Sequence, residues 1–497
     1  MDAFSIKKQI DSLRQAQLSW KNVETKQRAV IAGRVACLIA EQAEMLHASI
    51  QSAQRMDFRE TLSAEVIPLA DAARWLAKNA NKILKDRKVG WYQRPIWLGR
   101  VCSIVSRDPV GVVLIIGTWN YPLFLTGVQM LQAVVAGNAV IVKPAIGCEA
   151  ITACLQQMFV EAGVPPNLIA VLDSTIESAE QAIDVGIDKA VMTGSSQSGR
   201  KVLARLSSQL VPAALELSGC DAVFVLEAAD LDRVTDALLF GLRLNGGATC
   251  LAPRRVYIPQ LRIAELEQKL KERLSEVPRT TVPDATCKRI IYEIEASHAK
   301  LLKPSAPSEA RDSALSTNEW IQTGLPIVLT HVGPSSSLAN ADIFAPLLML
   351  FPYENIEEAI QQDCGCPYGL SASLFGKEDL AKCLAAKLNV GTVVINDMIA
   401  PTADPRLPFG GVRESGFGVT RGPEGLLEMT RPKVISVRRG RWLPHLDTPK
   451  PRDEPLLVGI LQWLHSPTWS KRMKGLFKIV NAIRSSSSRD DAGKTKT

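Results

Sequence analysis

The chain has 497 residues, of which 46% are hydrophobic and 22% charged, and its formal net charge is +7. This length predicts roughly two to four packed units, and the ordinary glycine and proline contents exclude a fibrous or low-complexity chain. Residues 438–497 contain 13 lysines and arginines and 5 aspartates and glutamates, or +8, which leaves −1 for the rest. Because a nucleic-acid enzyme carries positive charge on its folded body, we expect no nucleic-acid partner.

Ten cysteines are spread along the chain, without a C-x-x-C pair or a partnering histidine cluster. The polar N-terminal segment has no secretory signal, so reduced thiols in the cytoplasm and no metal site are expected. No apolar run approaches the roughly 18 residues needed to span a bilayer, so we do not expect an integral membrane protein.

The first 90 or so residues are predicted to be helical, because apolar residues recur at spacings of three and four. From Val110, short apolar runs alternate with amphipathic segments. Strands are predicted at 111–117, 139–144, 168–173, 189–194, 212–219 and 222–226, and helices near 126–136, 154–162 and 198–206. Repeated strand–helix units predict an α/β fold, with buried parallel sheets covered by helices on both faces.

The alternation returns after Cys250. Strands are predicted at 254–259 and 391–396, a helix at 262–274, and a short strand at 433–437 after a glycine-rich stretch. Beyond residue 438, several prolines precede a hydrophobic and basic stretch. The last dozen residues are polar and are predicted to be disordered.

Residues suited to chemistry occur in order along this α/β body. They are Trp119-Asn120 before Tyr121-Pro122, Lys143-Pro144, Thr193-Gly194-Ser195 with Gly199, Glu216, Cys250 in NGGATCLAPRR, Asp342-Ile343-Phe344, and LPFGGVRESGFG at 407–418. Over roughly residues 10–437, this ordered set resembles the aldehyde dehydrogenase superfamily. The short N-terminal region, the letters TCLAP at the thiol and the added tail are most similar to its class 3 or fatty-aldehyde branch.

The resemblance implies a two-domain fold of open parallel sheets flanked by helices, with a small oligomerisation element. Residues 1–217 are then the N-terminal helices and a Rossmann-like dinucleotide-binding domain, and residues 218–405 the catalytic domain bearing the thiol. Residues 406–437 are the return segment with the oligomerisation strand, and residues 438–497 a basic, partly amphipathic tail. A homodimer is also implied.

The resemblance assigns catalysis to Cys250, Asn120 and Glu216. A thiolate is the soft nucleophile that an aldehyde carbon requires, and the Asn120 amide with the Cys250 backbone N–H would hold the resulting alkoxide. A carboxylate in an apolar strand has a raised pKa, so Glu216 could activate the thiol or the water that cleaves a thioester. Taken singly, each residue also has an ordinary structural interpretation, such as a buried thiol or a turn asparagine.

The implied cofactor is NAD or NADP. Thr193, Gly194, Ser195 and Gly199 lie at a strand-to-helix turn, where backbone N–H groups and a helix dipole suit a pyrophosphate. The resemblance places Lys143 on the adenosine ribose, and Trp119, Asp342 and Phe344 near the nicotinamide side. The sequence TGSSQSG is not the G-x-G-x-x-G fingerprint and is a weak signal alone.

Several positions depart from the family pattern. Ile146 stands where a glutamate usually follows the lysine by three residues, so no carboxylate is present to repel a 2′-phosphate and NADP stays open. Asp342 replaces a glutamate, Ala248 a glutamine, and Cys220 a frequent lysine. None of these changes removes the nucleophile, the oxyanion donor or the base.

The tail contains a basic amphipathic pattern. Its apolar positions are Trp469, Met473, Leu476, Phe477, Val480 and Ile483, with Lys471, Arg472, Lys474, Lys478 and Arg484 between them. Such a helix suits a membrane interface, and it equally suits docking on its own protein or a second subunit. Peripheral membrane contact through residues 455–484 is therefore one of two open interpretations.

The sequence therefore predicts oxidation of an aldehyde, an apolar medium- or long-chain one from the branch resemblance, to the carboxylic acid through a thiohemiacetal and a thioester on Cys250. An acylating relative that uses coenzyme A or phosphate is one alternative, and Glu216 favours water over it. A non-catalytic scaffold and a thiol hydrolase are further alternatives. The hydrolase would leave the cofactor motifs unexplained.

Overall fold

The computed structural model describes residues 2–50, 58–92, 94–95, 98, 100–305, 312, 314–333, 336–439, 443–446 and 448–490, with no side chains described for 485–490. The chain forms two compact units. One contains Met1–Arg87 with Ile104–Ile435, and the other contains Lys88–Ser103 with Ser436–Thr497.

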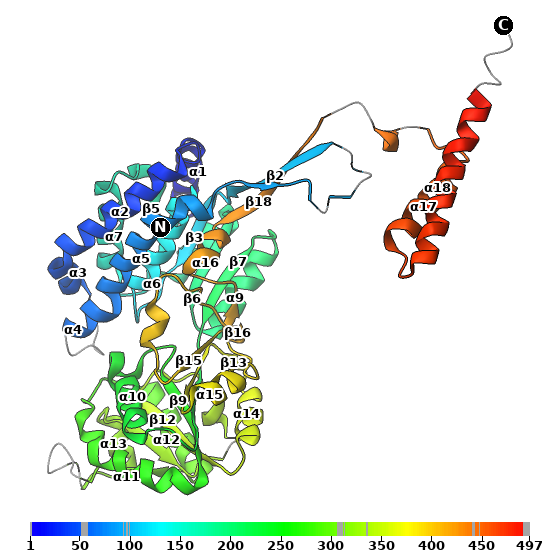
Figure 1. Cartoon of the computed structure of the whole chain (residues 1–497). Helices are drawn as coiled ribbons and strands as arrows, with labels where there is room; N and C mark the ends of the chain where they lie inside the picture. Colours follow the sequence, from blue (N-terminus) through cyan, green and yellow to red (C-terminus); the bar gives the residue numbers. More distant parts are fainter. Residues whose placement is uncertain are drawn as a thin grey trace. The chain divides into compact units, whose positions relative to one another are not determined.

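The first unit begins with helices that pack beside the six-stranded sheet described below. They are α1 (Ala3–Trp20), α2 (Thr25–Glu41), α3 (Ala43–Ser49), α4 (Phe58–Thr61), the π-helical turn η1 (Leu62–Val66) and α5 (Ile67–Ile83). Trp20 and Arg28 donate hydrogen bonds from their side chains to the carbonyl oxygens of Val134 and Val135. These bonds fix α1 and α2 on the end of α6 (Phe124–Ala136) (Figure 1).

A six-stranded sheet has the order β17-β7-β6-β3-β4-β5. Its strands are β3 (Val112–Ile116), β4 (Ala139–Lys143), β5 (Ile169–Val171), β6 (Lys189–Gly194), β7 (Ala213–Leu217) and the antiparallel edge strand β17 (Gly416–Phe417). Helices α6, α7 (Glu149–Glu161), α8 (Ile176–Val185) and α9 (Ser196–Ser207) connect the parallel strands. The predicted strand–helix alternation is confirmed here.

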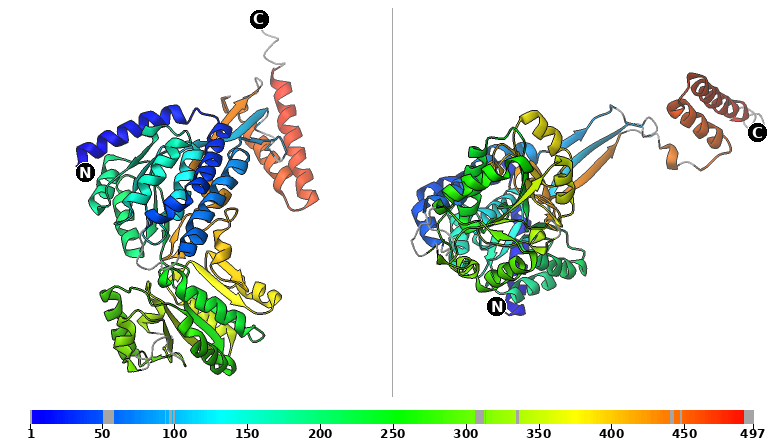
Figure 2. Two further views of the ribbon diagram at one scale, coloured as in Figure 1. Left: turned by 90° about the vertical axis from the view of Figure 1, so that its left-hand side faces the viewer. Right: turned by 90° about the horizontal axis from the view of Figure 1, so that it is seen from below.

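A seven-stranded sheet has the order β10-β11-β12-β9-β8-β14-β15. Its strands are β8 (Asp221–Val225), β9 (Pro253–Pro259), the antiparallel β10 (Lys300–Leu301), β11 (Ile327–Thr330), β12 (Leu347–Tyr353), β14 (Ser371–Phe375) and β15 (Thr392–Ile395). Its helices are α10 (Leu231–Arg243), α11 (Ile263–Arg273), α12 (Asp284–Ser297), α13 (Thr317–Gln322), α14 (Ile356–Cys364) and α15 (Glu378–Ala385). Figure 2 shows both sheets with their helices in two further views.

Both faces of the second sheet are buried. On β8, Ala222 and Phe224 belong to one apolar cluster, while Val223 and Val225 belong to another. Alternate side chains of a strand point to opposite faces, so each face carries its own core. This explains why the strand is apolar throughout rather than alternating with polar residues.

The chain then returns to the first sheet. The short strands β13 (Tyr368–Gly369) and β16 (Val412–Arg413) pair, and β17 follows before α16 (Gly422–Glu428). The strands β1 (Arg87–Val89), β2 (Val101–Pro109) and β18 (Thr430–Arg438) form a three-stranded sheet in the order β1-β2-β18. The predicted strand at 433–437 is part of β18.

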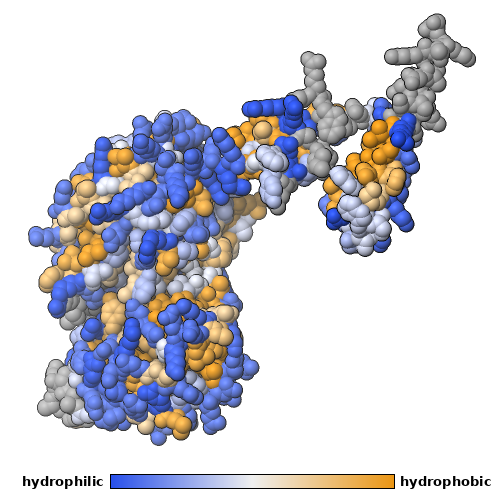
Figure 3. Space-filling model, in the orientation of Figure 1, coloured by the Kyte–Doolittle hydropathy of each residue, from blue (hydrophilic) through white to orange (hydrophobic). Residues whose placement is uncertain are grey.

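The second unit ends in a helical hairpin of α17 (Asp453–His465) and α18 (Trp469–Asp490). The helices approach closely at Gly459 and Gly475. Trp469 and Phe477 are 75% and 64% exposed. Hydrophobic side chains are visible on the hairpin surface in Figure 3. Among the described residues, no helix has the length and apolarity required to cross a membrane.

The prediction of disorder for the last dozen residues is wrong for 486–490, which continue α18. Extending a helix already nucleated by packing costs little per residue, so the polar serine run propagates it. Residues 491–497 lie outside the described part of the chain.

Candidate active site

Two cavities of the first unit meet at Cys250 and Glu216. The larger has a volume of about 500 Å³ and lies at the carboxyl ends of β3, β4, β6 and β7, the usual ligand position in an open α/β sheet. The second, called here the apolar cavity, has a volume of about 330 Å³. Its lining residues are Ser63, Ala64, Pro68, Tyr121, Phe124, Leu125, Glu216, Phe240, Leu244, Thr249, Cys250, Leu251, Ile399, Ala400, Thr402, Ala403, Phe409 and Arg421.

The loop before Cys250 is held close to other backbone. Gly247 has φ of +72°, and a Cβ atom there would lie 2.3 Å from the Ala345 carbonyl oxygen. Only glycine fits such an approach. Arg254 donates to the Gly247 carbonyl oxygen at 2.6 Å, and the Asn245 backbone N–H donates to the Glu60 carboxylate. The backbone at the thiol is therefore fixed from several directions.

Burial raises the pKa of the Cys250 thiol, and the negative charge of Glu216 raises it further. The thiol is therefore protonated at neutral pH in the protein without ligands. Because the thiolate is the nucleophilic form, attack on a carbonyl requires a base within the site.

Glu216 is the carboxylate suited to that task. It lies on β7, opposite Gly416 of β17, and its Oε2 accepts a hydrogen bond from the Thr420 hydroxyl at 3.2 Å. Burial raises the pKa of the Glu216 carboxyl, and the nearby guanidinium of Arg421 opposes that shift. A carboxylate with a raised pKa is a stronger base toward a thiol than an exposed one.

Asn120 lies beside the thiol loop with its amide oriented by three hydrogen bonds. Its Nδ2 donates to the Ala248 carbonyl oxygen at 3.0 Å, and its Oδ1 accepts from the Thr118 hydroxyl at 2.7 Å. The same Oδ1 also accepts a hydrogen bond from the Tyr121 backbone N–H at 3.1 Å. The amide is thus held against the residues that immediately precede Cys250, as an oxyanion donor requires.

The larger cavity also contains the predicted cofactor residues Lys143, Thr193, Gly194 and Ser195. Ser195 caps α9 by accepting a hydrogen bond from the Ser198 backbone N–H at 3.2 Å. The N-terminus of α9 therefore faces the cavity with its partial positive charge. Burial lowers the pKa of the Lys143 ammonium, so this cation is partly desolvated at the cavity wall. A helix N-terminus and a lysine fit a dinucleotide phosphate and ribose.

Trp119, Asp342 and Phe344 complete the wall nearest the thiol. The Trp119 and Phe344 rings meet edge to face, with their centroids 5.7 Å apart. Burial raises the pKa of Asp342, so its carboxyl is also partly desolvated. That these residues face the nicotinamide remains a prediction from the resemblance.

Gly199 differs from its predicted role. It is not among the residues that line the larger cavity. A Cβ atom at this position would lie 2.8 Å from Leu217 Cδ1, so the glycine allows α9 to pack closely on β7. Close packing of α9 on β7 is therefore a sufficient reason for glycine at this position.

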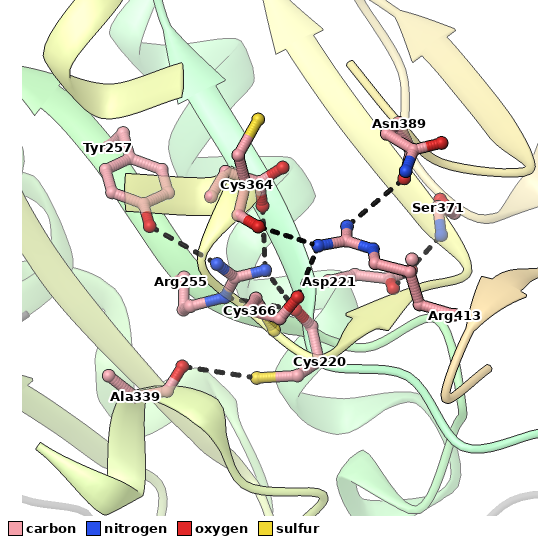
Figure 4. Close-up of polar contacts among 12 residues, drawn as sticks. Cys220, Asp221, Arg255, Tyr257, Ala339, Cys364, Cys366, Ser371, Asn389 and Arg413 are labelled. Carbon is pink, nitrogen blue, oxygen red and sulfur yellow. Dashed lines mark hydrogen bonds and ion pairs between the residues drawn. The ribbon is translucent and has the colours of Figure 1, made fainter. Parts of the chain in front are cut away.

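A buried polar network fixes the loop after β7 (Figure 4). Arg255 donates through Nε and Nη2 to the Cys220 carbonyl oxygen at 3.1 and 2.7 Å, and its Nη2 lies 2.8 Å from Asp363 Oδ1. Arg413 binds the carbonyl oxygens of Cys364, Cys366 and Asn389. Cys220, which replaces a frequent lysine, thus contributes backbone to a structural network.

Comparison with known proteins identifies the family. The model of the aldehyde dehydrogenase family matches residues 1–435. The chain belongs to the aldehyde dehydrogenase family. A 4,4'-diapolycopene aldehyde oxidase from Methylomonas sp is 30% identical over 452 residues, which cover 88% of this chain and 84% of the relative. The prediction of an enzyme of this family is confirmed.

Two further matches show the same relationship. A protein of Mycolicibacterium smegmatis that carries the name of an NADP(+) succinate-semialdehyde dehydrogenase is 28% identical, over 95% of this chain and 89% of the relative. The structure of Mycobacterium tuberculosis aldehyde dehydrogenase complexed with NAD+ matches with a TM-score of 0.79 and 26% identity, over 89% of this chain and 92% of that chain. The predicted α/β fold of this family, with parallel sheets flanked by helices, is confirmed.

Several residues at the site were not found by sequence reasoning. Thr420 and Arg421 follow the quoted motif LPFGGVRESGFG and contact or face Glu216. The π-helical turn η1 contributes Ser63 and Ala64 to the apolar cavity. A π-turn inside a helix often marks a functional site, but its sequence has no recognisable pattern. Within the described ranges, no group of three or more metal-ligating side chains is present.

Proposed function

We propose that this protein oxidises an aldehyde to the carboxylic acid with NAD or NADP, through a thioester on Cys250. The observation that carries the proposal is that Cys250 and Glu216 line both cavities. A substrate in the apolar cavity and a cofactor in the larger one would therefore meet at the same thiol. The NAD- and NADP-linked relatives support either cofactor.

The residues present suit each proton transfer of that reaction. Glu216 accepts the thiol proton, and the Cys250 thiolate forms a C–S bond to the aldehyde carbon while the carbonyl oxygen becomes an alkoxide. Held at Lys143 and the N-terminus of α9, a nicotinamide dinucleotide would supply the hydride acceptor for oxidation of this carbon to the thioester level. After the first proton has passed from Glu216 to solvent, Glu216 takes a second proton from water as the water attacks the thioester. The carboxylic acid is released as the C–S bond breaks, and the Cys250 thiolate recovers its proton from Glu216.

The alkoxide needs donors that are in place before the reaction. Asn120 Nδ2 and the Cys250 backbone N–H are the candidates, since the amide is already oriented against the thiol loop. Removal of one such donor typically lowers kcat by about 10²- to 10³-fold. In this role Asn120 contacts the reacting oxygen, whereas Thr118 only orients the Asn120 amide.

We further propose an apolar, medium- or long-chain aldehyde as substrate. The apolar cavity is lined mainly by carbon-rich side chains, including Phe124, Leu244, Leu251 and Phe409. Burial of an alkyl chain there would stabilise the complex by about 0.8 kcal/mol per methylene group. The resemblance to the fatty-aldehyde branch supports the same class.

The test measures formation of reduced nicotinamide with NAD or NADP across straight-chain aldehydes of increasing length. We expect kcat/KM to rise with chain length and the reaction to vanish in Cys250→Ser. Acid must appear in the same amount as reduced cofactor. If product forms only when coenzyme A or phosphate is added, the acylating alternative is correct instead.

For the remainder of the molecule, we propose a cytoplasmic homodimer whose hairpin α17–α18 lies on a membrane surface. The hairpin exposes Leu457, Leu461, Trp469, Phe477 and Ile483. Five cations of α18, Lys471, Arg472, Lys474, Lys478 and Arg484, are exposed on the same helix. Exposed apolar side chains with adjacent cations suit an anionic lipid interface.

Light scattering of the full chain tests the proposed dimer, and a measured mass equal to that of the monomer would contradict it.

A further inference from the structure

Arg421 places a buried cation in the wall of the apolar cavity. The residue is only 4% exposed. Its Cζ lies 4.1 Å from the centroid of the Phe409 ring and 5.4 Å from that of Phe124. Its Nη1 donates to the Thr402 carbonyl oxygen at 2.6 Å. The guanidinium is therefore fixed in position by two rings and a carbonyl, with no carboxylate in those contacts.

The charges around this cavity are few. Of its lining residues, Glu216 carries the one carboxylate and Arg421 the one permanent cation. Thr420, the residue before Arg421, donates a hydrogen bond from its hydroxyl to the Glu216 carboxylate. Strand β17 pairs with β7 at Gly416 and Glu216, so the segment after β17 passes beside the proposed base. Arg421, Glu216 and Cys250 thus share one desolvated space.

A buried guanidinium costs several kcal/mol unless a nearby negative charge compensates it. Here the compensation comes from the thiol and carboxyl together. Burial lowers the pKa of Arg421, while the charges of Glu216 and Cys250 raise it. Glu216, Asp221 and Asp342 all raise the pKa of the Cys250 thiol, and Arg421 lowers it. Arg421 is thus the cation of the cavity wall that opposes these carboxylates at the thiol. Arg254, whose pKa burial lowers and Asp342, Asp221 and Cys250 raise, faces the same groups from β9.

When Glu216 is ionised and Cys250 protonated, transfer of the proton moves one negative charge from the carboxylate to the thiolate. We propose that Arg421 is a positioning residue that balances this shared charge in both states, so that the proton can move from Cys250 to Glu216. This inference rests on the proposed role of Cys250 as the nucleophile.

A different role for the same cation would be to bind a carboxylate of the substrate. That role predicts selectivity for aldehydes with a second, acidic group. Charge balance at the thiol predicts the same loss for every aldehyde, because it acts before the substrate chain is recognised. The two roles are therefore separable by experiment.

The first experiment treats the free full-length enzyme with iodoacetamide for a fixed time at each pH between 6 and 10, and the alkylation midpoint is the pH at which half of Cys250 has reacted. Peptide mass spectrometry follows Cys250 separately from the other thiols. An opposite charge within about 4–6 Å shifts a pKa by 1 to 3 units, so we expect Arg421→Met to move the alkylation midpoint up by about one pH unit. Alkylation at pH 7 should be about tenfold slower, and Arg421→Lys should restore part of it.

Arg28→Met is the matched control. Arg28 is also a buried guanidinium bound to backbone carbonyl oxygens, and it lines neither cavity. Its removal should leave the alkylation midpoint unchanged. If Arg421→Met fails to fold, as judged by circular dichroism, the experiment uses Arg421→Gln instead, because glutamine keeps a donor for the Thr402 carbonyl. An unchanged midpoint in a folded neutral variant overturns the proposal.

The second experiment compares kcat/KM for hexanal and for an aldehyde with a terminal carboxylate. The proposal expects Arg421→Met to lower both by the same factor. A loss confined to the carboxylate-bearing aldehyde would show substrate binding and overturn charge balance. Alkylation needs no turnover, so it still tests the role of Arg421 in a protein that oxidises neither aldehyde. Absence of oxidation in the wild-type protein would contradict the proposed function and would not affect the alkylation result.

Discussion

Ile146 is 80% exposed and lies three residues after Lys143. In the family a glutamate usually stands there, and its carboxylate would repel a 2′-phosphate. We expect Ile146→Glu to weaken NADP binding more than NAD binding by about fivefold, since exposed charge interactions amount to roughly 1 kcal/mol. Fluorescence titration with both nucleotides checks this ratio.

Ile146→Gln is the control for that change, because it has similar size and no charge. It should leave the ratio of the two dissociation constants near the wild-type value. An unchanged ratio in Ile146→Glu would mean that position 146 does not face the 2′ position of the bound ribose.

Asp221 is a buried carboxyl whose Oδ1 accepts a hydrogen bond from the Ser371 backbone N–H at 3.2 Å. Burial raises its pKa well above the ordinary 3.8. The folded state therefore holds this proton more tightly than the unfolded state does. Stability contributed by the protonated carboxyl is present below about pH 4 and is lost as pH rises toward the folded-state pKa.

Asp221→Asn removes this proton and should flatten that part of the pH dependence. Urea unfolding between pH 5 and 8 should show a smaller decline in the free energy of unfolding than in wild type. The difference in slope has a ceiling of about 1.4 kcal/mol per pH unit for one proton. Parallel curves for the two proteins would show that Asp221 ionises normally.

At the scale of elements, the hairpin α17–α18 depends on close contact at Gly475. A Cβ atom there would lie 2.5 Å from the Trp463 backbone nitrogen and 2.9 Å from the Gln462 carbonyl carbon. Backbone cannot move aside as a side chain can, so Gly475→Val should separate the helices at a cost of about 1–3 kcal/mol. Hydrogen exchange of amides in 453–484 should then become faster.

Asn481→Val, at an exposed position of α18, controls for the lower helix propensity of valine. Protection equal to wild type in Gly475→Val would mean that the helices do not need this contact. The sequence pattern predicted α18 correctly, but it did not identify the residues of α18 that are buried against α17. The apolar residues Trp469, Phe477 and Ile483 are exposed, while small residues make the helix contact.

At the scale of the whole molecule, the proposed membrane contact is tested with vesicles. The full chain should sediment with vesicles that contain phosphatidylserine and remain in solution with purely neutral vesicles. A cation near an anionic surface contributes about 1 kcal/mol, so the five cations of α18 provide substantial attraction. A chain that ends at Gly440 should not sediment.

The double variant Trp469→Ala/Phe477→Ala keeps the charge and removes exposed apolar surface, so it should sediment weakly. Equal sedimentation of full and shortened chains would contradict membrane contact through residues 455–484. Sedimentation that is independent of phosphatidylserine would contradict the role of the cations.

Local pattern by itself determined much of this protein. The alternation of apolar runs and amphipathic segments predicted α6, α7, α9 and β3 to β8, because strand and helix periodicities are properties of neighbouring residues. Ordered motifs identified Cys250, Glu216 and Asn120, which the structure brings to one place. The family resemblance was visible because those motifs are short and retain their order.

Only the tertiary structure decided which groups share a buried space. Arg421 lies far from Glu216 and Cys250 in sequence, yet all three line the apolar cavity. The guanidinium of Arg421 is buried by Phe409 and Phe124, and hydrophobic periodicity along the sequence does not reveal these contacts. Gly199 likewise resembled a phosphate-loop residue until its contact with Leu217 was seen. Desolvation and charge compensation act between distant segments, so they exist only once the chain has folded.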